Sequence, residues 1–152
     1  MEEQDKRAYI FGSLFILANR LQYLGDRFDD EITFKQWGLL AVLSTFEGNS
    51  ASIGQVATFM GTSGQNVKKM ALILERKGFL ILQVDEKDNR RIRLIVTQKA
   101  IEHAKGREVR EEKFLQKLYQ GMDEELMGAM CRGLNKIEEN MRQLEEETKK
   151  DS

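Results

Sequence analysis

Carboxamide and ammonium side chains follow one another closely in the segment SGQNVKK, which begins at Ser63. The amides of Gln65 and Asn66 can hydrogen-bond to the edge of an adenine base, and the ammonium groups of Lys68 and Lys69 can neutralise phosphates. A generic surface helix would mix glutamate with its lysines, but this segment contains no acidic residue. These residue types at this spacing are suited to contacts with a nucleic acid.

A second basic segment, DEKDNRRIRLIVT, begins at residue 85 and places three arginines around a turn-like tip. Residues 61–99 include both segments and contain nine Lys and Arg residues against four acidic ones, a local charge of +5. The whole chain has a net charge of −1, so the remaining residues carry −6. The chain as a whole is therefore not a basic nucleic-acid binder, and any such role must be local to this region.

Other reactive side chains are few. Cys131 is the only cysteine, which excludes an intrachain disulfide and fits a reducing compartment. Its apolar neighbours favour inert packing over a reactive thiol. His103 is the only histidine and lies in a charged stretch without clustered ligands, so no metal site is expected. We find no nucleophile–base pair, phosphate-binding loop or isolated carboxylate pair, and therefore expect neither an enzyme nor a cofactor.

The length of 152 residues suffices for one small domain with helical extensions. The first residues, MEEQDKRAY, lack the apolar core of a signal peptide, and no apolar run approaches the ~20 residues that span a bilayer. We therefore expect a soluble, cytoplasmic protein with no membrane partner. The absence of proline suits long, uninterrupted helices.

Two helices with heptad-like apolar seams are predicted near the ends of the chain. The first seam runs from Ile10 to Phe28, and the last runs from Met127 to Leu144. Each seam has too much apolar surface for an isolated helix, so each requires a partner helix in the same chain or in a second copy. Residues 105–113, between the two seams, are nearly all charged and predict a solvated helical stretch.

Further helices are predicted between the seams by their capping residues. Capping boxes open two of them, at Thr33–Gln36 and at Ser52–Gln55, and Ser63 caps a third. The helix that starts after Thr33 is expected to end at Gly48-Asn49.

The periodicity then changes to that of β-strands. The runs FLILQV and RIRLIV, at 79–84 and 91–96, are separated by DEKDNR and predict a two-stranded hairpin. Gly78 occupies the position of a left-handed helix cap, and Thr97 caps the helix after the hairpin. The predicted order is four helices, a hairpin and two more helices.

Ala57, Gly61 and Val67 have the spacing of a helix-turn-helix. A small alanine lets the two helices cross closely, glycine permits a left-handed turn, and valine packs under the second helix. A plain pair of antiparallel helices without any DNA role would show the same spacing. The amide and lysine side chains on the second helix favour the DNA-binding interpretation.

The segment VATFMGTSGQNVKKMALILERKGFLILQVDEKDNRRIRLIVTQKA resembles the MarR family of winged-helix transcription regulators. Its most specific part is the hairpin, with Asp88, then Arg90, then a strand that ends in Val96-Thr97. Ala100 stands where the family usually has glycine. The resemblance implies a mainly α fold: a winged helix-turn-helix domain at 31–100, an N-terminal dimerisation helix at 1–30 and C-terminal dimerisation helices at 101–152.

The family resemblance also implies roles for individual residues. Arg90 should enter the minor groove from the tip of the hairpin, and Asp88 should hold it by an ion pair, although that pair could simply close the turn. Arg91 and Arg93 should touch the DNA backbone or other protein groups. The second helix of the helix-turn-helix corresponds to the family's recognition helix, which enters the major groove. There we expect base contacts from Gln65 and Asn66, and phosphate contacts from Ser63, Lys68 and Lys69.

The resemblance further implies a two-fold homodimer on palindromic double-stranded DNA, acting as a repressor that a small lipophilic or phenolic effector controls. An effector crevice could be lined by Tyr9, Phe11, Phe15, Phe34 and Trp37, although most of these residues suit an ordinary core. Two alternatives remain open at this point. One is a protein–protein interaction module anchored by Leu72 and Ile73, and the other is a redox regulator that uses Cys131.

Overall fold

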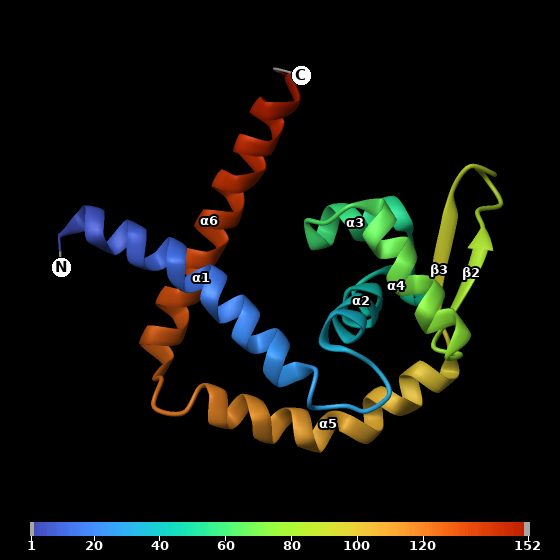
Figure 1. Ribbon diagram of the computed structural model, residues 1–152, viewed down its shortest axis with the longest axis horizontal. Helices are drawn as coiled ribbons and strands as arrows, with labels where there is room; N and C mark the ends of the chain where they lie inside the picture. The colour runs from blue at the N-terminus through green and yellow to red at the C-terminus, as the bar shows by residue number, and fades with distance from the viewer. Residues whose placement is uncertain (1, 151–152) are drawn as a thin grey trace. The chain divides into compact units, whose positions relative to one another are not determined.

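The computed structural model of the chain describes residues 2–150, which are mostly helical (Figure 1). Its elements are α1 (Glu3–Gly25), α2 (Phe34–Ser44), the 3₁₀ turn η1 (Glu47–Asn49), β1 (Ser50–Ser52), α3 (Ile53–Met60), α4 (Gly64–Arg76), β2 (Leu80–Val84), β3 (Ile92–Val96), α5 (Gln98–Leu118) and α6 (Glu124–Lys150). The predicted order of helices and hairpin is confirmed. The chain divides into two compact units, one ending at Gly106 and the other beginning at Arg107.

Helix α2 begins where its capping box predicts. The Thr33 hydroxyl accepts a hydrogen bond from the backbone N–H of Gln36 at 3.2 Å. In return, Oε1 of Gln36 accepts one from the backbone N–H of Thr33, also at 3.2 Å. The two bonds satisfy donors that the first helical turn leaves unpaired. The buried side of α2 carries Leu39 and Leu43, which are central in the core.

The end of α2 was predicted wrongly. The helix stops at Ser44, before the Gly48-Asn49 pair, which lies in η1 with positive φ angles of 66° and 51°. Hydroxyl groups mark the true end, because Ser44 and Thr45 donate hydrogen bonds to carbonyl oxygens of the last turn. Such side chains offer the backbone an alternative to a further helical turn.

Helices α3 and α4 form the predicted helix-turn-helix and lie in contact (Figure 1). Gly61 ends α3 in the left-handed conformation, with φ +62°. Ala57 is nearly inaccessible, and Val67 is fully buried beneath the second helix. The remaining buried residues of the pair are Val56, Ala71 and Leu74. This burial fixes which side of α4 faces outward.

The hairpin is also confirmed, and it belongs to a three-stranded antiparallel sheet of order β1-β3-β2. The third strand, β1, was not predicted. It has only three residues, and its register places Ala51 opposite Leu94 of β3. Leu94 and Phe79 are fully buried. Leu80, at the start of the hairpin, is almost completely buried. The sheet therefore packs its base into the same core as α2–α4.

The hairpin is joined to α4 and α5 by polar contacts at its base. The Thr97 hydroxyl donates to the carbonyl of Gly78 at 2.7 Å and accepts from the backbone N–H of Ala100 at 3.3 Å, which confirms Thr97 as a cap. Gly78 has the predicted left-handed conformation, with φ +79°. Nζ of Lys99 donates to the carbonyl of Lys77 at 2.8 Å. The end of α4 is therefore fixed to the first turn of α5.

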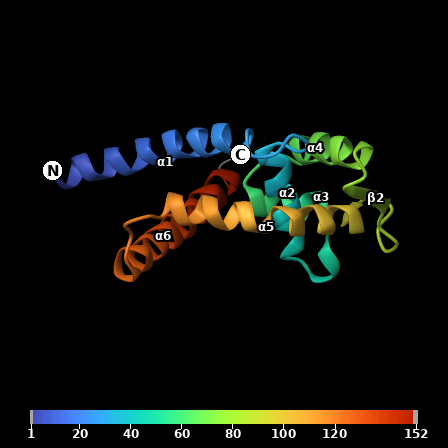
Figure 2. The ribbon, with the colours of Figure 1, turned by 90° about the horizontal axis from the view of Figure 1, so that it is seen from below.

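Helix α1 exposes the apolar surface that its sequence predicted, and none of its residues is buried. It leads away from α2, α3 and α4 in both ribbon views (Figures 1 and 2). The helix ends at Gly25, so Phe28 of the predicted seam lies beyond it. Gly25 is required because a Cβ atom there would lie 2.2 Å from the ring of Phe34.

The second unit contains the rest of α5 and all of α6. Gly121, with φ +83°, interrupts the chain between the two helices, and Asp123 caps α6 by accepting from the N–H of Leu126 at 2.8 Å. The stretch 105–113 was predicted to be solvated. Val109 is exposed, but Arg107 is buried, so the stretch is not uniformly solvated. Across residues 2–150, no helix has both the length and the apolar character that a bilayer span requires.

Candidate nucleic-acid interface

The N-terminal half of α4 presents its polar side chains to solvent. Gln65, Asn66, Lys68 and Lys69 are all exposed, whereas the opposite side of the helix is buried in the core. The helical period explains this division, because buried side chains recur every three or four residues and leave the others outward. The structure thus brings together, on one exposed surface, the amides and lysines that the sequence singled out.

Ser63 and Asn66 are already engaged in local hydrogen bonds. Oγ of Ser63 accepts from the backbone N–H of Asn66 at 3.2 Å and forms the N-cap of α4. Nδ2 of Asn66 donates to Oγ1 of Thr62 at 3.3 Å. This bond uses only one of the two N–H groups of the amide, so the second N–H and Oδ1 can still meet the edge of a base. Oγ of Ser63 keeps its hydroxyl proton for a phosphate oxygen, because capping uses it only as an acceptor.

The turn at the tip of the β2–β3 hairpin, residues 85–91, is called the wing below. It is organised around Asp88. Oδ1 of Asp88 accepts from the backbone N–H of Arg90 at 3.1 Å and lies 3.4 Å from Nε of the same residue. Oδ2 of Asp88 lies 3.3 Å from Nε of Arg91. The side chain of Arg90 is 93% exposed. The predicted ion pair is present, but Asp88 shares its carboxylate between two arginines.

The base of the wing holds a second polar group that joins all three strands. Nε and Nη2 of Arg93 donate to Oγ of Ser50 at 3.2 and 3.1 Å. Nη1 of Arg93 lies 3.5 Å from Oδ2 of Asp85, which follows β2 directly. Arg93 thus contacts protein groups, one of the two roles expected for it. Asp85 and Ser50 were not predicted as site residues from the sequence. The Asp85–Arg93 spacing across a predicted hairpin could have indicated the first of them.

The five aromatic residues proposed for an effector crevice do not form one cluster. Phe34 and Trp37 stack with ring centroids 5.6 Å apart and are half-buried. Tyr9, Phe11 and Phe15 are exposed on α1, at 65%, 81% and 70%, and are not core residues within this chain.

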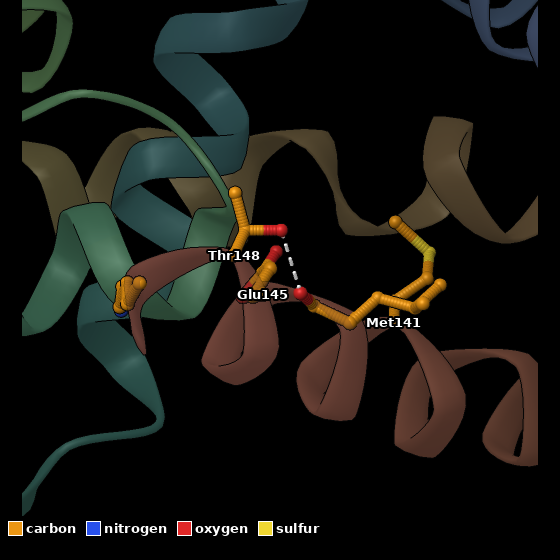
Figure 3. Close-up of a pocket in the computed structure, with 5 residues that line it drawn as sticks. Met141, Glu145 and Thr148 are labelled. Carbon is orange, nitrogen blue, oxygen red and sulfur yellow. Dashed lines mark hydrogen bonds between the residues drawn. The ribbon is translucent and has the colours of Figure 1, made fainter. Parts of the chain in front are cut away.

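The chain also has a shallow hollow on α6, lined by Met141, Leu144, Glu145, Thr148 and Lys149 (Figure 3). All five residues belong to one helix, and Thr148 bonds back to the carbonyl of Leu144. None of the five candidate aromatic residues contributes to it.

The remaining reactive side chains lie outside this surface. Cys131 is exposed on α6, so the expected packing of its thiol is not found within a single chain. His103 has a structural environment, with its ring edge-on to Phe79 and its Nε2 close to Asp29. Among the described residues, no three His, Cys, Asp or Glu side chains come together as a metal ion would require.

Comparison with known proteins gives a relative by sequence. The chain is 33% identical over 97 residues to the transcriptional activatory protein BadR of Rhodopseudomonas palustris. The match spans 62% of this chain and 55% of BadR, so the chain matches only about half the length of this relative. No family model matches the chain.

Solved structures of MarR family regulators match a larger part of the chain than the sequence relative does. AbsC, a MarR family transcriptional regulator from Streptomyces coelicolor, has a TM-score of 0.79 at 15% identity and covers 93% of this chain and 97% of its own. Sco3205, a second MarR family regulator from that organism, solved in complex with DNA, also scores 0.79 at 15% identity, over 90% of this chain and 88% of its own.

BpsR of Bordetella bronchiseptica, whose DNA binding is regulated by 6-hydroxynicotinic acid, scores 0.71 at 18% identity, over 84% of this chain and 91% of its own. At these identities the likenesses show the fold. The chain has the winged-helix fold of MarR family transcription regulators.

Proposed function

We propose that this chain is a transcription regulator of the MarR type that binds a specific double-stranded DNA sequence through α4 and the wing. The supporting observation is the division of α4 into a buried face and an exposed face that carries amides and lysines near its N-terminus. A helix held in this way is suited to the major groove, where amides read bases and lysines neutralise phosphates. We expect such a regulator to act in the cytoplasm, on the genomic DNA.

The wing would supply the second contact. Arg90 extends into solvent from a turn that Asp88 holds, and a guanidinium group is attracted to a narrow, negative minor groove. An exposed ion pair contributes little to folding stability, so the pair is better explained by the direction it gives to Arg90. Arg91 would contact the DNA backbone beside it, and Ser63 would donate to a phosphate at the start of α4.

The proposal includes a homodimer formed by the terminal segments, 1–30 and 101–152. Each of the two outer helices exposes a row of apolar side chains, exemplified by Phe11 on α1 and by Leu144 on α6, which is 61% exposed. Rows of this extent indicate a surface that another helix covers. A two-fold dimer would place two copies of α4 about one DNA turn, ~34 Å, apart on a palindromic operator.

We further propose that the protein represses transcription by occupying a promoter, and that a small lipophilic or phenolic effector releases it. An effector acts by preferring a dimer in which the two recognition helices have the wrong spacing. The Phe34–Trp37 stack is the best-formed part of the candidate crevice. Because BadR is described as an activatory protein, the direction of regulation needs a reporter assay, in which loss of a repressor raises expression.

The direct experiment is selection of bound duplexes from a random DNA library by the purified full-length chain. The proposal predicts enrichment of a palindrome, and it predicts that Lys68→Ala/Lys69→Ala weakens binding to it. A library that shows no enrichment would contradict DNA recognition and favour the protein–protein module, for which Leu72 on α4 is a 40%-exposed anchor.

A further inference from the structure

We propose that Asp85 and Arg93 are positioning residues for DNA binding, which set the direction in which the wing presents Arg90. This inference rests on the proposed function, because it assumes that Arg90 contacts DNA. It concerns residues at the base of the wing that do not themselves need to touch the duplex.

A continuous series of contacts connects the sheet to the wing tip. Ser50 of β1 accepts from the guanidinium of Arg93 on β3, and the same guanidinium meets the carboxylate of Asp85 at the end of β2. Oδ1 of Asp85 accepts from the backbone N–H groups of Lys87 at 2.8 Å and Asp88 at 3.2 Å. Asp85 therefore ties the backbone of the turn to a guanidinium fixed on the sheet.

The next contacts lead from that backbone to the arginine. Asp88, whose N–H is held by Asp85, accepts from the N–H and Nε of Arg90 through its own Oδ1. The turn is closed by two backbone bonds of 2.8 Å, from the N–H of Asp85 to the carbonyl of Arg91 and from the N–H of Arg91 to the carbonyl of Asp88. A rotation of the turn about the sheet would lengthen the contact between Asp85 and Arg93.

Carboxylates in the wing disfavour DNA binding because phosphates repel them, so their presence there requires another role, such as orienting Arg90. A negative side chain beside the phosphates is repelled, so a wing that only needed positive charge would lack Asp85. Asp85 is 14% exposed, less than half of the 33% for Asp88, and points into the base of the wing. The backbone N–H of Lys87, assisted by that of Asp88 and by Arg93, holds the pKa of Asp85 below its ordinary value of 3.8.

The sign of the pH dependence follows from this shift. A carboxyl group whose pKa is lowered on folding stabilises the folded state above its ordinary pKa and loses that contribution as the pH falls below it. Asp85 is therefore ionised, and its contacts are intact, throughout the neutral range in which DNA binding is measured.

The test compares the full-length protein with Asp85→Asn, Asp85→Ala and the control Glu86→Gln on one selected duplex. Asparagine can still accept the two turn N–H groups but loses the charge that faces Arg93, whereas alanine loses both. We expect affinity to fall roughly threefold for Asp85→Asn and roughly tenfold or more for Asp85→Ala. Glu86→Gln removes the same charge from an exposed neighbour, so its affinity should stay equal or rise.

The same measurement in an Arg90→Ala background separates positioning from general stability. If Asp85 acts through Arg90, then Asp85→Ala should cause no further loss once Arg90 is absent. Equal losses in both backgrounds, or stronger DNA binding by Asp85→Asn, would overturn the positioning role. If Arg90→Ala itself binds normally, the wing assignment of the proposed function fails and this inference fails with it. Asp85→Asn keeps the comparison available if the alanine variant does not fold.

Discussion

Nε2 of His103 lies 2.7 Å from Oδ2 of Asp29, and this contact joins the loop before α2 to the first turns of α5. Both side chains are shielded, at 19% and 4% exposure. Oδ1 of Asp29 also accepts from the N–H groups of Glu31 and Ile32 at 2.7 and 3.2 Å. The only histidine in the chain is thus a structural link between segments 74 residues apart.

Replacing His103 should destabilise the fold. His103→Ala removes the imidazole partner of a shielded carboxylate and its ring contact with Phe79, so the free energy of unfolding should fall by about 1–3 kcal/mol in urea titrations. His103→Gln retains a donor and should lose less. Glu102→Ala, at an exposed position of the same helix, should stay within about 0.5 kcal/mol of wild type. A His103→Ala protein as stable as that control would refute the structural role.

Arg90→Ala should weaken binding to the selected duplex by about tenfold or more, because one guanidinium would be lost from each minor-groove contact. The thermal midpoint should not change, since the side chain is almost fully exposed. Arg90→Lys should restore only part of the affinity, because an ammonium lacks the planar, weakly hydrated guanidinium. Arg142→Ala, which breaks an exposed pair with Glu138 on α6, is the matched control and should bind normally.

Gln65 and Lys69 should have different effects, although they lie one helical turn apart. Gln65→Ala should change which bases are preferred in a repeated library selection. Lys69→Ala should weaken all duplexes alike and lower the slope of log affinity against log salt. Each phosphate contact contributes about 0.9 to that slope, and a homodimer carries the substitution twice, so the expected decrease is roughly two. Identical behaviour of the two variants would contradict this division between base and phosphate contacts.

Gly64→Ala tests how closely DNA approaches the start of α4. A Cβ atom at this position would meet only Cγ2 of Ile53 at 3.6 Å, an ordinary contact, so the protein should fold and gain up to about 1 kcal/mol of helix stability. If a phosphate packs against this backbone, the added methyl group should lower DNA affinity despite the higher stability. Unchanged affinity would show that the backbone at residue 64 is not in close contact with the duplex.

Local features of the fold were predictable from the sequence, and long-range ones were not. The capping box at Thr33–Gln36 and the left-handed Gly61 depend only on residues close in sequence, so the local sequence pattern was sufficient to predict them. Strand β1 has no pattern of its own and exists because Ser50 pairs with Ile95 of β3. The end of α2 differs from the prediction because the hydroxyls of Ser44 and Thr45 bond to its last turn, whereas the Gly-Asn pair lies in the separate turn η1.

The same distinction applies to the candidate site. The exposed amides and lysines of α4 follow from its helical period, and the Asp88–Arg90 pair was expected from the resemblance of the hairpin to the MarR family. The contact between Arg93 and Ser50 spans 43 residues, and it forms only because a short strand that was not predicted lies beside β3. Polar groups that support a site from another strand cannot be found by spacing along one segment.

The salt dependence of binding to a duplex selected from a random library tests the central claim most directly, with wild type measured beside Lys68→Ala/Lys69→Ala. We predict that wild-type affinity falls steeply as salt rises and that the double substitution lowers the log–log slope by roughly four, since four phosphate contacts would be lost from the dimer. A wild-type protein with no salt-sensitive attraction to any duplex would contradict the claim, as would an unchanged slope in the variant.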